Sequence, residues 1–456
     1  MIMKKLFGTL LPAFQGVVCL LIVLSAPQVQ AKASQIEEVV SPGGIRAWLV
    51  QERSIPIISM EVAWRGGASV EPAEKAGLAT LVASTMDEGA GELDSRAFQK
   101  ALSELAISLS FQAGKDSFQG SLKTLSKNRD EAFRLFGMAV TQPRFDEEPV
   151  NRIRNQILVS LNRALSSPNT LASRAWFQEA FPDHAYGIPS KGTLETVPGL
   201  SRDDLAGYAK RMIARDNMVI AVVGDIGSEE LGRYLDDMFG TLPAKADYTA
   251  PKAVEPRSEA VVRIIEQDIP QSVIMFGGQG VKRDDPDYYA AYVLNYILGG
   301  GGFESRLTEE IREKRGLVYS VYSYLYPFEA AGVHIGGMGT RNDAAVQALG
   351  LLKAELAKIR KDGVSDAELA AAKTYLNGSF PLRLSSNSRI ADILLSMQLS
   401  HLPPAYLGER DALINAVTPA DIRRVAKRLM DPDKLIVVVV GKPAGLSETM
   451  PEGEKQ

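Results

Sequence analysis

AKRMIARDNMVIAVVG, residues 209–224, and AKRLMDPDKLIVVVVG, residues 426–441, are two copies of one pattern in this chain. Both begin with Ala-Lys-Arg and end in an apolar run closed by glycine, and a constant offset of 217 residues separates them. A run rich in β-branched residues that ends at glycine is typical of a buried strand. Repetition at a fixed offset indicates a duplicated unit. The sequence therefore predicts two homologous lobes.

A helix-start signal precedes each copy. The segments Ser201-Arg202-Asp203-Asp204 and Thr418-Pro419-Ala420-Asp421 both place a hydroxyl N-cap before acids of the first helical turn. Helix–strand–glycine units are common in α/β proteins, but sixteen positions in one register favour duplication. Each lobe should thus contain an amphipathic helix that leads into a buried strand.

The rest of the chain mixes strand and helix patterns. We expect an α+β fold of two α/β-sandwich lobes, each packing helices on one face of a mainly antiparallel sheet. The expected strands are residues 58–64, 261–265, 272–276 and 317–325, and the expected helices are 77–86, 96–105, 127–139, 149–165, 286–298, 344–360 and 366–378.

Composition sets the lobe boundaries. Residues 242–257 contain three prolines and lack apolar periodicity, which is typical of a linker. The predicted lobes are residues 32–241 and 258–445, followed by a flexible tail at 446–456.

The first 31 residues have the features of a secretory signal peptide. Lys4 and Lys5 precede an apolar stretch, and Val29-Gln30-Ala31 has the pattern that signal peptidase recognises. A membrane anchor is the alternative, but glycine and proline leave the run shorter than the roughly 20 residues of a spanning helix. We expect cleavage after Ala31 and a periplasmic protein with no membrane contact.

Composition also excludes several kinds of site. Cys19 is the only cysteine and lies in the signal peptide, so disulfides, iron–sulfur clusters and Cys-ligated zinc are excluded. Loss of Lys4 and Lys5 changes the net charge from −4 to −6. No basic, aromatic-rich stripe indicates nucleic-acid binding, and no EF-hand-like group of acids indicates a calcium site.

Several segments resemble the insulinase/pitrilysin-type zinc metallopeptidases, and the resemblance covers essentially the whole mature chain. They are Trp-Arg-Gly-Gly-Ala-Ser at 64–69, Glu-Pro at 71–72, Gly-Leu-Ala at 77–79 and Phe-Pro-Asp-His-Ala-Tyr-Gly at 181–187. The resemblance implies that the two lobes form half of a clamshell.

The zinc motif of that family is missing. In active members the helix after Gly-Leu-Ala carries His-x-x-Glu-His, whose histidines bind zinc while the glutamate activates a water. Here the corresponding residues are Thr80, Ala83 and Ser84, and the position of the third ligand, a glutamate, falls at Ser160. The chain's histidines are never paired at helical spacing; they are His184, His334 and His401. We expect no metal in this chain, and the resemblance places zinc in a partner subunit.

Four consecutive glycines mark the second lobe. Gly299, Gly300, Gly301 and Gly302 precede Phe303, and such a run predicts a loop that another chain can approach closely. We assign these five residues to substrate binding. A plain flexible turn explains the glycines equally well, whereas a phosphate-binding loop is disfavoured because no Gly-Lys-Ser/Thr follows.

Arg312 and Tyr319 follow this glycine run. Residues 306–315 are expected to be helical, with Gly316 as a C-cap, and a strand rich in tyrosine follows. Alone, Arg312 reads as a cation favoured at a helix C-terminus and Tyr319 as an ordinary sheet residue. Together they resemble the family's Arg/Tyr pair, seven residues apart, which binds substrate carbonyls and stabilises the oxyanion.

The metal ligands are therefore absent while the Arg/Tyr pair is present. The resemblance implies a non-zinc-binding subunit of a heterodimeric periplasmic metallopeptidase, inactive on its own. A zinc-motif-bearing partner would supply metal and general base, and Arg312 and Tyr319 would act in trans on unfolded peptides. Two alternatives stay open: a non-catalytic scaffold, and a peptide-binding or chaperone-like protein that works alone.

Overall fold

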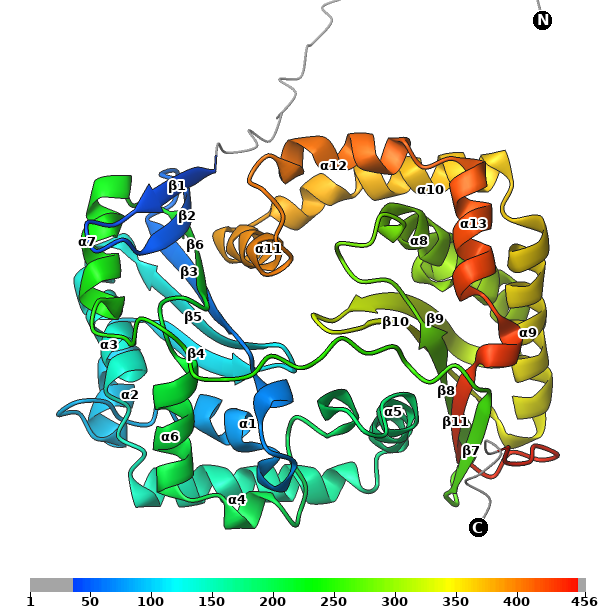
Figure 1. The fold of residues 1–456 in the computed structure, drawn as a ribbon, viewed down its shortest axis with the longest axis horizontal. Coiled ribbons are helices and arrows are strands. Elements are labelled where there is room, and N and C mark those ends of the chain that lie inside the picture. Colours follow the sequence, from blue (N-terminus) through cyan, green and yellow to red (C-terminus); the bar gives the residue numbers. More distant parts are fainter. Residues whose placement is uncertain (1–35, 450–456) are drawn as a thin grey trace, which may run out of the picture.

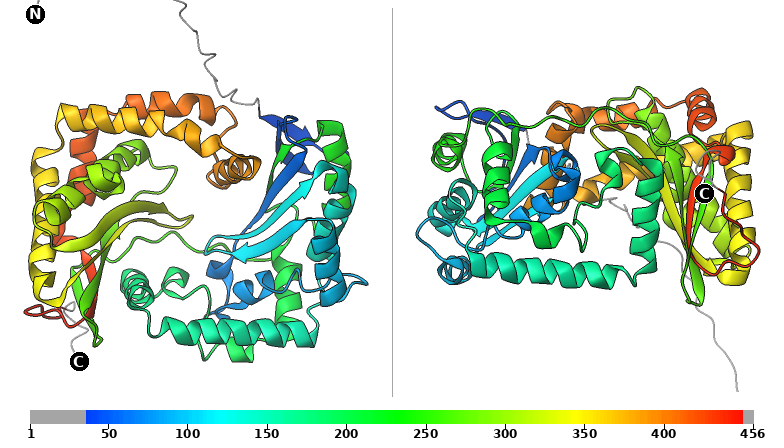
Figure 2. Two further views of the ribbon diagram at one scale, coloured as in Figure 1. Left: turned by 180° about the vertical axis from the view of Figure 1, so that it is seen from behind. Right: turned by 60° about the horizontal axis from the view of Figure 1, so that its bottom comes forward.

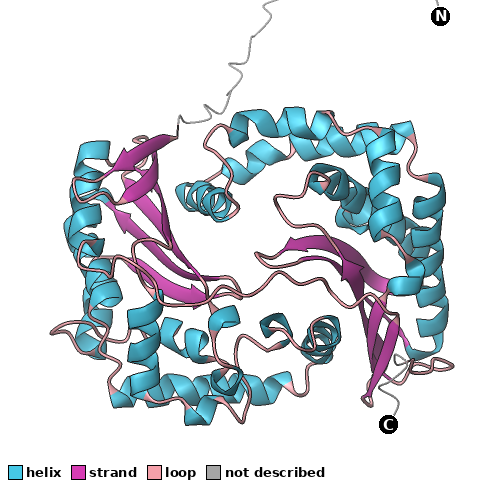
Figure 3. Ribbon diagram, in the orientation of Figure 1, coloured by secondary structure: helices cyan, strands magenta, loops and turns pink. Residues whose placement is uncertain are grey.

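The computed structural model describes residues 36–449, so the predicted signal peptide at 1–31 lies outside the described part. Two halves face one another, each with a sheet on its inner side and helices on its outer side (Figure 1). Figure 3 separates helices from strands and shows the same arrangement in both halves. No helix within residues 36–449 has the length and apolar character needed to cross a membrane.

The first half is built on a mixed six-stranded sheet in the order β1-β2-β6-β3-β5-β4, in which only β2 and β6 pair in parallel. Its strands are β1 (Glu37–Val40), β2 (Arg46–Gln51), β3 (Ile57–Arg65), β4 (Ser108–Ala113), β5 (Ser117–Leu125) and β6 (Met218–Gly224). Its helices are α1 (Leu78–Ala83), α2 (Ser95–Glu104), α3 (Arg129–Thr141), α4 (Glu147–Ala164), α5 (Pro168–Ala180), α6 (Arg202–Met212) and α7 (Ser228–Phe239).

The second half has a five-stranded sheet in the order β7-β11-β8-β10-β9, with β7 and β11 as its parallel pair. This confirms the predicted α+β class with mainly antiparallel sheets. The strands are β7 (Val261–Glu266), β8 (Gln271–Gln279), β9 (Val318–Pro327), β10 (Gly332–Arg341) and β11 (Ile436–Gly441). The helices are α8 (Tyr288–Asn295), α9 (Ala345–Asp362), α10 (Asp366–Gly378), α11 (Asn387–Leu399), α12 (Tyr406–Asn415) and α13 (Pro419–Leu429).

The sequence repeat corresponds to a structural repeat. α6 leads into β6 and α13 leads into β11, and both helices begin with a capping box, at Ser201 and at Thr418. Both strands end in a glycine at positive φ, 151° at Gly224 and 146° at Gly441. A Cβ at Gly224 would come within 2.3 Å of the Ile57 carbonyl oxygen, so the closing glycine is sterically required.

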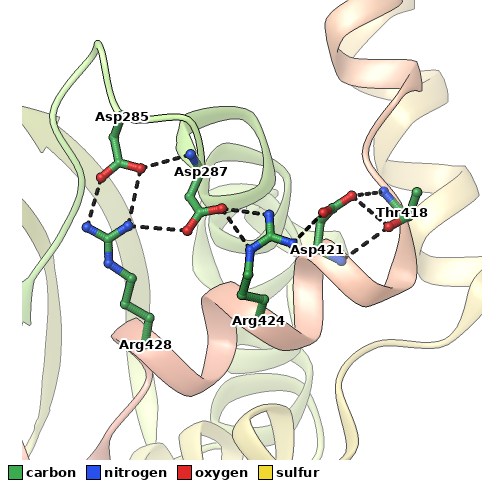
Figure 4. A network of polar contacts seen from close by, with 6 residues as sticks. All are labelled: Asp285, Asp287, Thr418, Asp421, Arg424 and Arg428. Carbon is green, nitrogen blue, oxygen red and sulfur yellow. Dashed lines mark hydrogen bonds and ion pairs between the residues drawn. The ribbon is translucent and has the colours of Figure 1, made fainter.

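An ion-pair network holds α13 against the turn that precedes α8 (Figure 4). Arg428 Nη2 lies 2.8 Å from Asp285 Oδ2, and Arg424 Nη2 lies 2.7 Å from Asp287 Oδ1. Arg424 also pairs with Asp421, the acid of the capping box. Single surface ion pairs contribute little, but here two arginines from consecutive turns fix one helix to one turn.

The inner face of each sheet is covered by a helix from the other half, which corrects the expectation of helices on one face only. Trp176 of α5 is buried with Val438 and neighbouring residues of β11 in the second half. Leu394 of α11 is buried with Val223 of β6 and its neighbours in the first half. In Figures 1 and 2 these two helices lie on the inner sides of the two sheets. This exchange fits the composition of β6 and β11. A strand made almost entirely of apolar residues must be covered on both faces.

The segment between the lobes is held by backbone hydrogen bonds to both halves of the protein. Residues 243–260 form no helix or strand. The Val254 N–H donates to the Ala330 carbonyl at 2.9 Å, and the Arg257 N–H donates to the Ala180 carbonyl at 3.0 Å. Near the other terminus, Thr449 exchanges two backbone hydrogen bonds with Val262, and residues 450–456 of the predicted tail lie outside the described part.

Replacing Trp176 by alanine should destabilise the half of the protein to which this residue does not belong in sequence. Trp176 is fully buried, and its indole N–H donates to the Ile436 carbonyl at 3.1 Å. Truncation of a buried tryptophan costs about 3–5 kcal/mol. We expect a lower midpoint in chemical denaturation and faster amide exchange in β11. Leu382→Ala, at a residue that is 74% exposed, is the control and should change neither.

His334 should make the fold sensitive to acid. It is fully buried in β10, and burial lowers the pKa of its imidazole to about 4. Between pH 6.5 and 4 the unfolded chain binds a proton that the folded chain does not, so stability falls as pH falls. The expected loss is roughly 3 kcal/mol. Denaturation at pH 7.5 and pH 4.5 measures it, and in His334→Leu the difference should shrink by that amount; an unchanged difference would contradict the assignment.

Candidate functional site

The three expected zinc-motif positions lie on or at the end of α1, and all serve structural contacts. Thr80 Oγ1 donates to the Ser190 carbonyl at 2.7 Å. Ser84 Oγ donates to the Thr80 carbonyl at 2.8 Å. Ala83 is buried in the core of the first half. The helix is also shorter than predicted, spanning Leu78–Ala83 instead of 77–86.

Glu71 is the residue that starts this helix. Its carboxylate accepts the backbone N–H groups of Gly77 and Ala79, and Gly77 adopts φ 97°, a conformation that favours glycine. Burial raises the pKa of Glu71 to about 8, while these N–H donors and the Lys115 charge act in the opposite direction. The Glu-Pro and Gly-Leu-Ala segments are therefore needed to begin α1, with or without a metal.

The position of the third ligand, Ser160, lies near the end of α4. It faces a cavity that Ser190, whose carbonyl accepts the Thr80 hydroxyl, also lines. The side chains at the expected ligand positions do not fit zinc, which needs imidazole, thiolate or carboxylate ligands. Across residues 36–449, no group of three or more His, Cys, Asp or Glu side chains could hold a metal ion.

The histidines serve other purposes. His184 Nδ1 accepts the Tyr186 N–H at 3.1 Å, and its Nε2 lies 3.1 Å from the Lys252 carbonyl oxygen. His401 lies 3.9 Å from Glu329 at the surface. The third histidine, His334, is buried in β10.

The Phe181–Gly187 segment joins the two halves through Tyr186. The Tyr186 hydroxyl donates to Asp116 Oδ1 at 2.7 Å and accepts the Ala330 N–H at 2.9 Å. Asp116 Oδ2 accepts the Glu329 N–H at 2.9 Å. Since Asp116 precedes β5 and Ala330 belongs to the β9–β10 hairpin, one buried tyrosine connects both sheets. The sequence gives no sign of this contact.

The glycine run is more regular than expected. Gly299 and Gly300 complete a π-helical turn, Tyr296–Gly300, so the predicted loop is wrong at these two positions. A Cβ at Gly299 would lie 2.8 Å from the Ser323 backbone nitrogen, and Asn295 makes two hydrogen bonds to Ser323. The close approach that glycine permits is thus to the chain's own strand β9. Gly302, at φ 60°, has open space around it.

Arg312 lies between two exposed aromatic rings. Its guanidinium carbon is 4.9 Å from the centroid of the Phe303 ring and 6.0 Å from that of the Tyr319 ring. Phe303 is 70% exposed and Tyr319 is 82% exposed. The structure therefore brings together three of the sequence-predicted site residues on an open surface. We call Phe303, Arg312 and Tyr319 the Arg/Tyr cluster.

The local backbone differs from the predicted helix. Arg312 belongs to a π-helical segment, Thr308–Glu313, instead of an α-helix over 306–315. Gly316 ends it at φ 60°, with its N–H donating to the Arg312 carbonyl at 2.8 Å. This agrees with the expected glycine C-cap. The only ion pair of Arg312 among residues 36–449 is with Glu313, at 3.6 Å. The guanidinium can therefore donate to a carbonyl oxygen of a bound chain.

A row of tyrosines extends from this cluster along β9. Tyr322, Tyr324 and Tyr326 alternate on one face and are each 40–47% exposed. The first two rings are parallel, with centroids 5.9 Å apart. The row continues through Tyr326 to Phe328, at 4.4 Å. The alternation Tyr-x-Tyr-x-Tyr is visible in the sequence and was the available signal for this surface.

Comparisons with known proteins agree with this arrangement. A family model described as Peptidase M16 inactive domain matches residues 199–376. The non-peptidase homologue YmxG of Helicobacter pylori is 28% identical over 332 residues, covering 72% of this chain and 76% of that protein. A probable mitochondrial-processing peptidase subunit beta of Arabidopsis thaliana is 23% identical over 430 residues, covering 92% and 79%.

Among solved structures, a peptidase M16 inactive domain from Pseudomonas fluorescens has a TM-score of 0.83 and 29% identity. The match covers 91% of this chain and all of that one. The chain is thus similar over most of its length to members of the insulinase-like M16 metallopeptidase family, matches that family's inactive-domain model over residues 199–376, and lacks the family's catalytic zinc motif.

Substitution of Gly299 tests how closely this residue packs against β9 beneath the Arg/Tyr cluster. We expect Gly299→Ala to destabilise the protein by about 1–3 kcal/mol, because the new methyl group meets the β9 backbone. Gly350→Ala is the matched control: Gly350 lies in α9, where a Cβ has open space, so the change should be neutral or stabilising by up to about 1 kcal/mol. Thermal unfolding compares the two, and equal effects would contradict the packing argument.

Proposed function

We propose that this chain is the non-zinc subunit of a heterodimeric metallopeptidase and supplies Arg312 and Tyr319 to a substrate bound at the partner's metal. The observation that carries the proposal is the Arg/Tyr cluster. It exposes a guanidinium, a phenol and a phenyl ring, of which two are large aromatic side chains. Aromatic side chains are costly to leave in water, and their exposure marks a contact surface.

The Arg/Tyr cluster provides hydrogen-bond donors but neither the metal nor the general base of a peptidase. An Arg N–H and a Tyr O–H can each donate to a peptide carbonyl, and they gain most when that oxygen becomes negative during attack by water. Activating the water requires a metal or a base at the same peptide bond. The corresponding positions, Thr80, Ala83, Ser84 and Ser160, provide neither. The missing parts must therefore come from a second polypeptide with the zinc motif.

Further support comes from the relatives. One is named as a subunit of a processing peptidase and another as a non-peptidase homologue. The first thirty-one residues support export to the periplasm, with cleavage after Ala31. Unfolded peptides are the proposed substrates, because an extended chain can align its carbonyl groups with donors on a strand.

Activity should require both subunits, and it should depend on the two donors. We expect Arg312→Ala or Tyr319→Phe to lower peptide hydrolysis by the mixture with a zinc-motif partner by about 10²–10³-fold. Tyr319 is exposed, and half-buried Arg312 contacts only exposed side chains such as Phe303 and Glu313, so the free energy of unfolding should change by less than about 1 kcal/mol. Initial rates with a quenched fluorescent peptide measure the effect.

Two variants serve as controls. Tyr375→Phe removes a hydroxyl at a tyrosine that is 57% exposed, and Arg341→Ala removes an exposed arginine from the end of β10. Both should leave the rate unchanged. Full activity of the partner alone, or of the mixture with Arg312→Ala, would exclude the proposed role in favour of a scaffold.

A further inference from the structure

The cavity that Ser160 lines is strongly basic. The absence of zinc ligands does not by itself explain this composition. The cavity has a volume of about 460 Å³, within the usual range for small-ligand sites. The end of α4, the first turns of α5 and the loop at 187–191 enclose it. Its lining includes four basic side chains and no acidic one; the four are Lys115, Arg163, Arg174 and Lys191.

Three of these cations have no charge partner. Within residues 36–449, the side chains of Arg163, Arg174 and Lys191 make no hydrogen bond or ion pair. Lys115 Nζ donates to the carbonyl oxygens of Tyr186 and Ile188, at 2.7 and 3.0 Å. About half of the other arginines in the described part of the chain pair with carboxylates, as Arg424 and Arg428 do. Like charges gathered around one cavity repel each other unless an anion joins them.

The walls between the cations favour an apolar group. Leu161, Phe177, Ile188 and Pro189 line the cavity, and Phe177 also receives Lys115 at 5.2 Å over its ring. Hydroxyl groups complete the lining, among them Ser167, which caps α5 by accepting the Thr170 N–H. The positive end of a thirteen-residue helix therefore opens at the same place. The site combines an anion-binding rim with an apolar interior.

One wall of the cavity packs against the end of the tyrosine row of β9. The Phe177 ring contacts the Phe328 ring at 6.0 Å, and Phe328 contacts Tyr326 at 4.4 Å. From there, the exposed tyrosines lead toward the Arg/Tyr cluster. A single carboxylic acid would use only the cavity, but an extended chain that ends in a carboxylate would use both surfaces.

We propose that this cavity binds the C-terminal carboxylate of a peptide whose last side chain is apolar, with the preceding residues lying toward the tyrosines of β9. Arg163, Arg174 and Lys191 hold the carboxylate, and the apolar wall receives the terminal side chain. This binding needs no metal and no partner, so it is separate from the catalytic role proposed above.

The test uses the mature chain alone. An N-terminally labelled heptapeptide that ends in leucine with a free carboxylate is titrated by fluorescence anisotropy, beside the same peptide ending in a carboxamide. We expect the carboxamide to bind at least tenfold more weakly. The double variant Arg163→Gln/Arg174→Gln should weaken binding of the free acid to the same extent, whereas Arg341→Gln, outside the cavity, should not.

Each other outcome overturns the proposal. Equal affinity for acid and carboxamide, or full affinity in the double variant, would show that the cations do not recognise a carboxylate. Hexanoate that competes as strongly as the peptide would show that the site takes a simple carboxylic acid. Circular dichroism confirms that the variants fold.

Discussion

The structure depends on burial of both faces of two central strands. β6 and β11 consist almost entirely of apolar residues, so each needs a cover on its outer side and another on its inner side. Helices of its own half cover the outer side of each sheet, and one helix from the opposite half covers the inner side. Because α5 and α11 exchange reciprocally, neither half can bury its sheet without the other. The two halves are one cooperative unit.

This exchange also determines where the functional surfaces lie. With Trp176 of α5 fixed against the second sheet, the C-terminal half of α5 is held next to the β9–β10 hairpin, where Phe177 contacts Phe328. Tyr186 reinforces the position by joining Asp116 to the same hairpin. Phe177, which lines the cavity near Ser160, therefore packs against Phe328 at the end of β9, although the two residues come from opposite halves of the sequence.

The former metal site shows how a catalytic element becomes a structural one. Glu71 and Gly77 still begin α1, and Thr80 still reaches the loop at Ser190. The helix has kept its place while its ligands have become small side chains and hydroxyl groups. The adjoining cavity is lined by four basic side chains and no acidic one. A zinc ion nearby would make such a cluster electrostatically unfavourable, so the basic cavity is compatible with a site that no longer binds metal.

The sequence by itself determined the duplication, the capped helices and the absence of zinc ligands, because these are local properties of residue type and spacing. It also located Arg312 and Tyr319, whose proximity follows from a short helical segment that leads directly into a strand. Its prediction failed where distant segments decide the backbone: Gly299 is π-helical because β9 leaves no room for a Cβ there. Only the tertiary structure showed the exchanged helices, the Tyr186 bridge and the basic cavity. Each of these depends on packing between residues that are not neighbours in the sequence, from 28 positions apart for Arg163 and Lys191 to 260 for Trp176 and Ile436, and neither periodicity nor composition specifies which buried face meets which.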